Sequence, residues 1–327
     1  MIISKTPFRM SFFGGGTDFP EYFNEFGGSV ISTTFDKYVY VTVRNLPRFF
    51  DYSTEIIYSK QERVKSIDDI NHPMVRNVLK YLSLNNIHIS YDADLPAKSG
   101  LGSSSTFAVG LLNACYHLKN ECYSSEKLAN DAIYVERILC DEAGGWQDQI
   151  AAAVGGFNRI DFEHNSFTVK PINISSSRKN ELNSNLMMFF TGFTRFSADI
   201  HGNKTTSNEE RSNKLKMIKN LVNKAQEILE NDSIELNEFG KLLNEEWKLK
   251  KSTSSKVSNS KIDELYRLAI ENGAIGGKLL GAGGGGFLLF YVPKNKQDSV
   301  RKSLKLLEVP FRFEDKGTQI IYNSPEI

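Results

Sequence analysis

Residues 95–105 combine a lysine, two glycines and three consecutive serines in the sequence LPAKSGLGSSS. A strand-like stretch precedes this segment and a helix-like stretch follows it. Backbone N–H groups at the start of a helix carry partial positive charge and attract phosphate. Glycines let the backbone approach a ligand closely, and a serine hydroxyl can reach a metal ion held by phosphates. The segment does not fit G-x-x-x-x-G-K-[ST], so we expect a phosphate-binding loop that is not a Walker A loop.

The 24 glycines of the chain fall largely in clusters, including residues 14–16, 100–102 and 281–286. The last of these, GAGGGG, formally satisfies G-x-G-x-x-G. However, the apolar run FLLFYV follows it and predicts a strand, whereas a dinucleotide-binding site needs a helix there. We therefore reject a dinucleotide site. A ligand-binding loop and a structural turn before a buried strand both remain open for this cluster.

Composition excludes several classes of protein. The chain has 327 residues and a formal net charge of +1, which does not favour a nucleic-acid-binding surface. No apolar run is long enough to span a membrane, and residues 1–7 do not resemble a signal peptide. The three cysteines form no CxxC pair and are typical of reduced thiols. We expect a cytoplasmic protein that binds neither nucleic acid nor membrane.

The first half of the chain mixes strands with helices. Residues 37–43 and 87–91 have the composition or alternation of strands. Apolar residues recur at helical spacing after residue 105, and a second helix is predicted from residue 124. Gly144 and Gly145 then break the chain before a short helix over residues 146–154.

A polar break at residues 175–180 follows two strand-like stretches. The length suggests two domains, and we place the boundary in this break, giving domains 1–178 and 179–327. In the second domain, residues 204–261 are mostly helical in pattern, and we interpret their many charges as a solvated surface.

Three stretches together resemble the motifs of the GHMP kinases, the family of galactokinase, homoserine kinase, mevalonate kinase and phosphomevalonate kinase. The first motif resembles FRMSFFGGGTD (residues 8–18), the second PAKSGLGSSS (96–105) and the third GGKLLGAGGGG (276–286). They occur in the family's order and cover nearly the whole chain. The resemblance implies an α+β fold with an N-terminal domain like ribosomal protein S5 and a ferredoxin-like C-terminal domain. It also implies phosphoryl transfer from ATP with Mg²⁺ as cofactor.

Within the family, residues 11–22, 144–149 and 191–197 are most similar to the kinases of D-glycero-D-manno-heptose 7-phosphate. Trp146 departs from that group, which often carries Lys there. The similarity implies phosphorylation of the anomeric hydroxyl to the 1,7-bisphosphate, for nucleotide-activated heptose and surface polysaccharide synthesis. The alternatives are a fucokinase-like or other sugar-1-kinase acting on an unphosphorylated sugar, and a non-catalytic sensor of ATP and sugar. A sensor should lack the base or the metal carboxylate, and the chain has both.

The resemblance also assigns the nucleotide site. The ATP phosphates would contact the second motif, through Lys98, Ser99, Gly100, Gly102, Ser103, Ser104 and Ser105. Ser104 and Glu136 correspond to the ligands of Mg²⁺. A surface helix residue paired with a lysine is the alternative for Glu136.

Asp148 matches the catalytic aspartate of the family, in the predicted first turn of a helix. That position favours an ionised carboxylate, which could accept the proton of the sugar hydroxyl. Arg9 could orient Asp148 and offset charge on the transferring phosphoryl group. The alternatives are a carboxylate that only complements the helix dipole and an arginine on the surface.

The sugar would contact the first and third motifs together with Asp148. The residues concerned are Gly15, Gly16, Thr17, Asp18, Gly283 and Gly284. A phosphorylated sugar needs a further cation, for which Arg195 and Lys278 are the candidates. We expect a small-molecule sugar phosphate as substrate and a monomer or homodimer as the assembly.

Overall fold

The computed structural model describes residues 1–97, 99–193 and 208–324. Within these residues the larger sheet has nine strands, in the order β13-β1-β2-β5-β3-β4, with β12 and β6 also paired to β2 and β7 paired to β6. Its strands are β1 (Ile2–Phe13), β2 (Gly28–Asn45), β3 (Thr54–Ile57), β4 (Gln61–Val64), β5 (Ile87–Ala93), β6 (Phe157–Glu163), β7 (Ser166–Pro171), β12 (Phe313–Glu314) and β13 (Gln319–Asn323).

Strand β2 organises this sheet. It pairs with β1 along most of its length, with β6 through residues 28–33 and with β5 through residues 39–45. Those pairings are antiparallel, and among the described strands only β3 and β5 pair in parallel. The strands predicted over residues 37–43 and 87–91 are confirmed as parts of β2 and β5.

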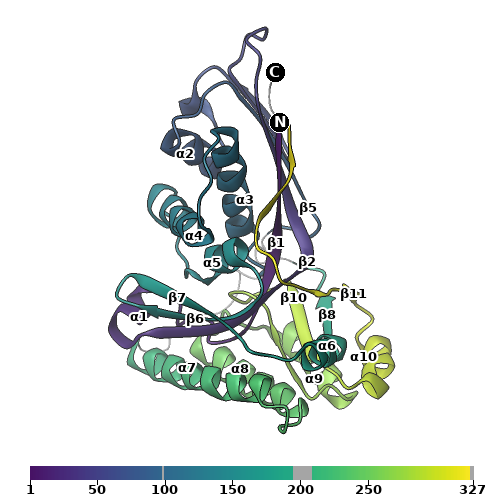
Figure 1. The fold of residues 1–327 in the computed structure, drawn as a ribbon. Coiled ribbons are helices and arrows are strands. Elements are labelled where there is room, and N and C mark those ends of the chain that lie inside the picture. The colour runs from purple at the N-terminus through teal and green to yellow at the C-terminus, as the bar shows by residue number, and fades with distance from the viewer. Residues whose placement is uncertain (98, 194–207, 325–327) are drawn as a thin grey trace.

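Helices cover one face of the larger sheet (Figure 1). They are α2 (Pro73–Tyr81), α3 (Ser103–Leu118), α4 (Ser125–Ile133) and α5 (Gln147–Val154), and α4 continues into a π-helical segment over Tyr134–Leu139. Helix α3 is buried almost throughout, and the Ser4 hydroxyl donates to the Gly110 carbonyl at 2.8 Å. The predicted helices after residues 105 and 124 and over 146–154 are all confirmed. Helix α1 (Pro20–Phe26) follows β1 and lies beside β6, at the end of the sheet away from the chain termini.

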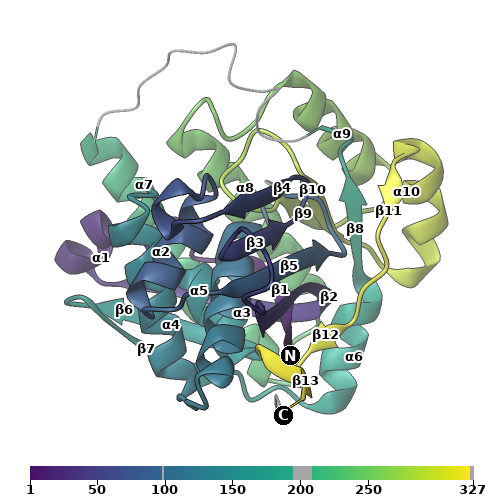
Figure 2. The same cartoon turned by 90° about the horizontal axis from the view of Figure 1, so that it is seen from above.

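The other sheet is smaller and antiparallel, with the strand order β11-β8-β10-β9. Its strands are β8 (Leu186–Phe190), β9 (Gly276–Leu279), β10 (Phe287–Tyr291) and β11 (Leu307–Glu308). Around it lie α6 (Ser176–Asn185), α8 (Asn237–Thr253), α9 (Ser260–Glu271) and α10 (Gln297–Leu304). Helix α7 (Asn208–Glu230) packs against α8 and against β1 and β2 of the larger sheet. Seen from above, β8 and α10 lie on the side of β1 and β2 away from α3 and α4 (Figure 2). As predicted, the third glycine cluster precedes a strand, β10.

The two sheets share the C-terminal part of the chain. After β11, strands β12 and β13 return to pair with β2 and β1 of the larger sheet. The expected boundary between residues 178 and 179 falls within α6, and the division into domains at that point stays a prediction. Among the described residues, no helix combines the length and apolar character needed to cross a membrane.

Phe12 joins these parts. Its side chain is fully buried and makes edge contacts with Phe157 of β6, Phe239 of α8 and Phe313 of β12, at centroid distances of 5.5, 5.3 and 6.3 Å. One ring at the end of β1 therefore packs against the larger sheet, a helix beside the smaller sheet and the returning C-terminal strand.

We predict that Phe12→Ala lowers the free energy of unfolding by about 3–5 kcal/mol, since it leaves a cavity where these elements meet. Denaturation in urea measures the loss. Phe49→Ala, at a side chain that is 93% exposed, is the matched control and should change the stability little. Equal stability of the two variants would show that Phe12 does not join the elements.

Candidate active site

The second and third glycine-rich motifs meet through close contacts between their backbones. A Cβ atom on Gly100 would lie 2.4 Å from the Leu280 carbonyl oxygen, and one on Gly281 would lie 2.3 Å from the Gly100 Cα. A Cβ on Gly286 would lie 2.1 Å from the Ser99 carbonyl oxygen. These separations are too short for any side chain. The phosphate loop and the third motif therefore depend on glycine to pack against each other.

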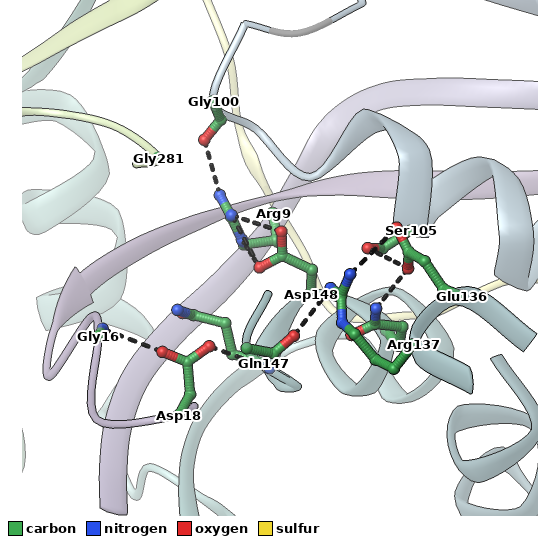
Figure 3. A network of polar contacts seen from close by, with 12 residues as sticks. Arg9, Gly16, Asp18, Gly100, Ser105, Glu136, Arg137, Gln147, Asp148 and Gly281 are labelled. Atoms are coloured by element: carbon green, nitrogen blue, oxygen red, sulfur yellow. Dashed lines mark hydrogen bonds and ion pairs between the residues drawn. The ribbon is translucent and has the colours of Figure 1, made fainter. Parts of the chain in front are cut away.

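Arg9 connects the phosphate loop to α5 (Figure 3). It projects from β1, and its Nε and Nη2 donate to the two oxygens of Asp148 at 2.7 and 2.8 Å. Its Nη1 donates to the Gly100 carbonyl at 3.0 Å. Arg9 is only 4% exposed, so it is not a surface arginine. A bidentate arginine fixes the position of a carboxylate more strictly than a single contact does.

Asp148 lies in the first turn of α5, beside the start of α3. A Cβ on Gly102, the residue before α3, would lie 3.1 Å from Asp148 Oδ2. The carboxylate is therefore close to the helix terminus whose N–H groups can receive phosphate. The Asp148 side chain is 21% exposed, whereas that of Arg9 is 5% exposed. Arg9 is thus the buried support, and Asp148 is the partner that a substrate can reach.

Asp18 places a second carboxylate next to this pair. It is 2% exposed, and its oxygens accept hydrogen bonds from the backbone N–H groups of Gly16 at 3.0 Å and Gln147 at 3.4 Å. Burial, and then the charge of Asp148, raise the pKa of Asp18 above its usual range. A Cβ on Gly145 would lie 1.9 Å from Asp18 Oδ2, so this approach needs glycine at 145. The first motif and the segment before α5 are therefore built around one carboxylate.

Trp146 stands where we expected a lysine from the resemblance to heptose 7-phosphate kinases. It helps to hold the first motif against the start of α5. Its backbone N–H donates to the Asp18 carbonyl at 3.0 Å, and its half-buried ring packs against Phe23 of α1 at a centroid distance of 4.8 Å. The side chain therefore fastens α5 to α1.

Glu136 lies in the π-helical segment after α4, where such turns often mark functional residues. It is 2% exposed and accepts hydrogen bonds from the Ser105 hydroxyl, at 2.7 Å, and from the Gln149 amide. Burial, the largest influence, raises the pKa of Glu136. Glu136 is thus a buried residue beside the phosphate loop, not a surface residue paired with a lysine.

The serine that reaches Glu136 is Ser105, whereas Ser104, which we expected beside it, is exposed. Ser105 follows Ser104 on α3, and its side chain points into the protein. Ser99 is buried, and its hydroxyl has no hydrogen-bond partner among the described residues. Lys98 lies outside the described residues.

Arg137 holds the loop that leads to α5. It donates to the carbonyl oxygens of Glu142 at 3.1 Å and Gly145 at 2.9 Å, and Gly144 leaves room for its guanidinium group. We did not single out Arg137 from the sequence. Its position directly after Glu136 was the signal in the sequence. The same short turn holds Glu136 beside the start of α3 and Arg137 beside the loop before α5.

Lys278 does not reach the surface that a substrate would occupy. It is 1% exposed, donates to the Phe12 carbonyl at 2.5 Å and pairs with Glu246 of α8 at 3.3 Å. Lys278 therefore links the end of β1 to α8 inside the protein. Arg195, the other cation expected to bind a sugar phosphate, lies outside the described residues.

The other expected sugar contacts differ in their surroundings. Gly15 and Gly16 are partly exposed in the loop after β1, whereas Thr17 is buried and its hydroxyl donates to the carbonyl oxygens of Gly14 and Ser29. Gly283 and Gly284 lie against Val257, whose carbonyl accepts the Gly284 N–H at 3.2 Å.

The charges of residues 204–261 are not all solvated, which corrects our interpretation of that segment. Glu246 of α8 is fully buried, and Lys250, one turn later, is half-buried. The Lys250 ammonium donates to the Gly281 carbonyl at 2.5 Å. Burial, and then the charge of Lys278, lower the pKa of Lys250 to about 7. Helix α8 therefore brings a cation to the third motif that the sequence analysis missed.

Comparisons with known proteins agree with this arrangement. The model of the GHMP kinases N terminal domain matches residues 70–156, and that of the GHMP kinases C terminal domain matches residues 218–307. A D-glycero-alpha-D-manno-heptose 7-phosphate kinase of Campylobacter jejuni subsp. jejuni is 31% identical over 326 residues, covering 93% of each chain.

Two further matches are informative. The bifunctional fucokinase/GDP-fucose pyrophosphorylase of Arabidopsis thaliana is 26% identical over 87% of this chain and 29% of its own length. The crystal structure of a D-glycero-D-manno-heptose 1-phosphate kinase from Bacteriodes thetaiotaomicron has a TM-score of 0.80 at 25% identity, covering 99% of this chain and 100% of that one. On this evidence, the chain belongs to the GHMP kinase family and is a sugar kinase that transfers a phosphoryl group from ATP.

Proposed function

We propose that this sugar kinase transfers the γ-phosphoryl group of ATP to the anomeric hydroxyl of D-glycero-D-manno-heptose 7-phosphate, giving the 1,7-bisphosphate. The observation that carries the proposal is the Arg9–Asp148 pair. The pair lies between the phosphate loop and the loop of residues 14–19, called here the Asp18 loop. The choice of sugar rests on similarity to the Campylobacter jejuni heptose 7-phosphate kinase. The product would be a sugar 1-phosphate suited to nucleotide-activated heptose and surface polysaccharide synthesis.

In the proposed reaction, the anomeric oxygen attacks the γ-phosphorus, the bond to the ADP oxygen breaks and the hydroxyl proton passes to Asp148. Both oxygens of Asp148 already accept from Arg9, but each carboxylate oxygen has a further lone pair for the sugar hydroxyl. Arg9 holds the base in place and contributes positive charge near the transferring group. Asp18, which accepts from the Gly16 and Gln147 N–H groups, would hold the partly exposed Gly15 and Gly16 in place beside the sugar.

The N-terminus of α3 and the loop before it would receive the ATP phosphates. The donors there would be backbone N–H groups and the side chains of Ser103 and Ser104, because the Ser105 hydroxyl donates to Glu136. Because the Gly100 carbonyl accepts a hydrogen bond from Arg9, the phosphate loop and the Arg9–Asp148 pair are held in a fixed relative position.

Glu136 and Gln149 offer oxygen ligands that would suit Mg²⁺, beside the Arg137 guanidinium, whose Nη1 lies 3.8 Å from Glu136 Oε1. Mg²⁺ commonly takes one or two protein carboxylates and completes its shell with phosphates and water. Glu136 would be the carboxylate, and the buried Gln149 Oε1 nearby has no hydrogen-bond partner among the described residues. When bound, Mg²⁺ neutralises phosphate charge, and Ser105 would orient Glu136 toward it.

Turnover against a panel of sugars tests the proposed substrate. The panel is D-glycero-D-manno-heptose 7-phosphate, sedoheptulose 7-phosphate, mannose, mannose 6-phosphate and fucose, with ADP release as the measurement. We expect rapid turnover of the heptose phosphate alone. Preference for fucose or another free sugar would replace this proposal with a sugar-1-kinase of the fucokinase type, to which the chain also has similarity.

Two neighbouring serines test the metal site. Ser105→Ala should raise the Mg²⁺ concentration needed for half-maximal turnover by about 10-fold or more, because Glu136 loses its orienting donor. Ser104→Ala, at the exposed position, should raise it less. Thermal unfolding of both variants checks that each is folded. A larger effect at Ser104 would assign the role to that serine.

A further inference from the structure

Lys250 is a cation beside the site that makes no ion pair with an acidic residue of the described ranges. Within the described part of the chain, its ammonium makes no ion pair, and the Gly281 carbonyl is the acceptor that it contacts. By contrast, Arg9 is paired with Asp148 and Lys278 with Glu246. A half-buried cation without a counter-ion is costly, and binding an anion would remove that cost.

The charged groups around Lys250 come from four parts of the fold. Glu246 lies one turn earlier on α8, Lys278 on β9, Arg9 on β1 and Asp18 in the loop after β1. Asp18 belongs to the motif expected to contact the sugar. Gly281, which Lys250 contacts, packs against Gly100, so Lys250 lies where the phosphate loop meets the first motif. Because the start of α3 supplies separate donors for the ATP phosphates, we assign Lys250 to the sugar.

We propose that Lys250 binds the phosphate group that the sugar substrate itself carries, next to Gly281 and the Asp18 loop. The inference rests on the proposed function and takes the role expected for Lys278, which is buried beneath the site. A lysine here distinguishes a phosphorylated sugar from a free one, because a free sugar brings no charge to neutralise the ammonium group.

The protonation of Lys250 in the free enzyme makes binding of the phosphorylated sugar depend on pH. Burial and the nearby charges of Lys278 and Arg9 lower its pKa to about 7, while Glu246 and Asp18 oppose that shift. Below this pH the free enzyme presents an ammonium group, and above it a neutral amine that attracts phosphate weakly. The KM for the phosphorylated sugar should therefore rise with pH above about 7.

The test compares Lys250→Met, Lys250→Arg and the matched control Lys248→Met, at an exposed lysine of the same helix. KM is measured for the heptose 7-phosphate, for the same heptose without phosphate and for MgATP, between pH 6 and pH 9. Lys250→Met should raise KM for the heptose phosphate by roughly 10- to 100-fold, the value of one charged hydrogen bond. The KM for the free heptose should change much less.

Lys250→Arg supplies a second readout, because arginine stays charged throughout this range. It should retain preference for the phosphorylated sugar and lose the rise of KM with pH. Lys248→Met should behave as the wild type does. Thermal unfolding shows whether each variant is folded, and the pH profile of Lys250→Arg keeps the test decisive if Lys250→Met is not.

The contrary results separate the inference from the proposed function. An unchanged preference for the phosphorylated sugar in Lys250→Met, or an increase confined to the KM for MgATP, would overturn the inference alone. A wild-type enzyme that prefers the free heptose would overturn the proposed function and this inference together.

Discussion

The bidentate contact between Arg9 and Asp148 is the interaction on which the site depends. Arg9 comes from the first strand and Asp148 from α5, and the same guanidinium also holds the Gly100 carbonyl. One buried side chain thereby sets the carboxylate that we propose as the catalytic base in relation to the phosphate loop. The glycines complete this arrangement, since Gly100 and Gly281 allow two loops to touch through their backbones. In the proposed reaction, this fixed relation would let the phosphoryl acceptor and donor meet in line with little rearrangement.

Much of the fold could be predicted because its signals are local. Periodic apolar residues identified α3 and α4, and the run after residue 286 identified β10 as a strand and excluded a dinucleotide site. The resemblance to the family placed Arg9, Asp148 and Asp18 in one site, and the structure does bring them together. Ser104 and Ser105 were harder to separate, because only the direction of each side chain at the start of α3 decides which reaches Glu136.

The charges of α8 show why other parts of the site could not be predicted. Glu246 and Lys250 have the spacing of a surface ion pair on a helix, and we interpreted the charges of their segment as a solvated surface. Yet the apolar stripe of Phe239, Leu243 and Trp247 runs along the same face, so continuing its period would have placed both charges toward the protein interior. Their partners, Lys278 and Gly281, are more than 25 residues away in sequence, and only tertiary packing shows the contact.

A double-mutant cycle on Arg9 and Asp148 tests the central claim most directly. Turnover is measured for Arg9→Gln, Asp148→Asn and the double variant, with nucleotide binding followed separately. If the pair acts as one unit, Asp148→Asn lowers kcat by about 10²-fold or more, and adding Arg9→Gln lowers it little further. Independent losses that multiply to about 10⁴-fold, or wild-type turnover in Asp148→Asn, would contradict the account.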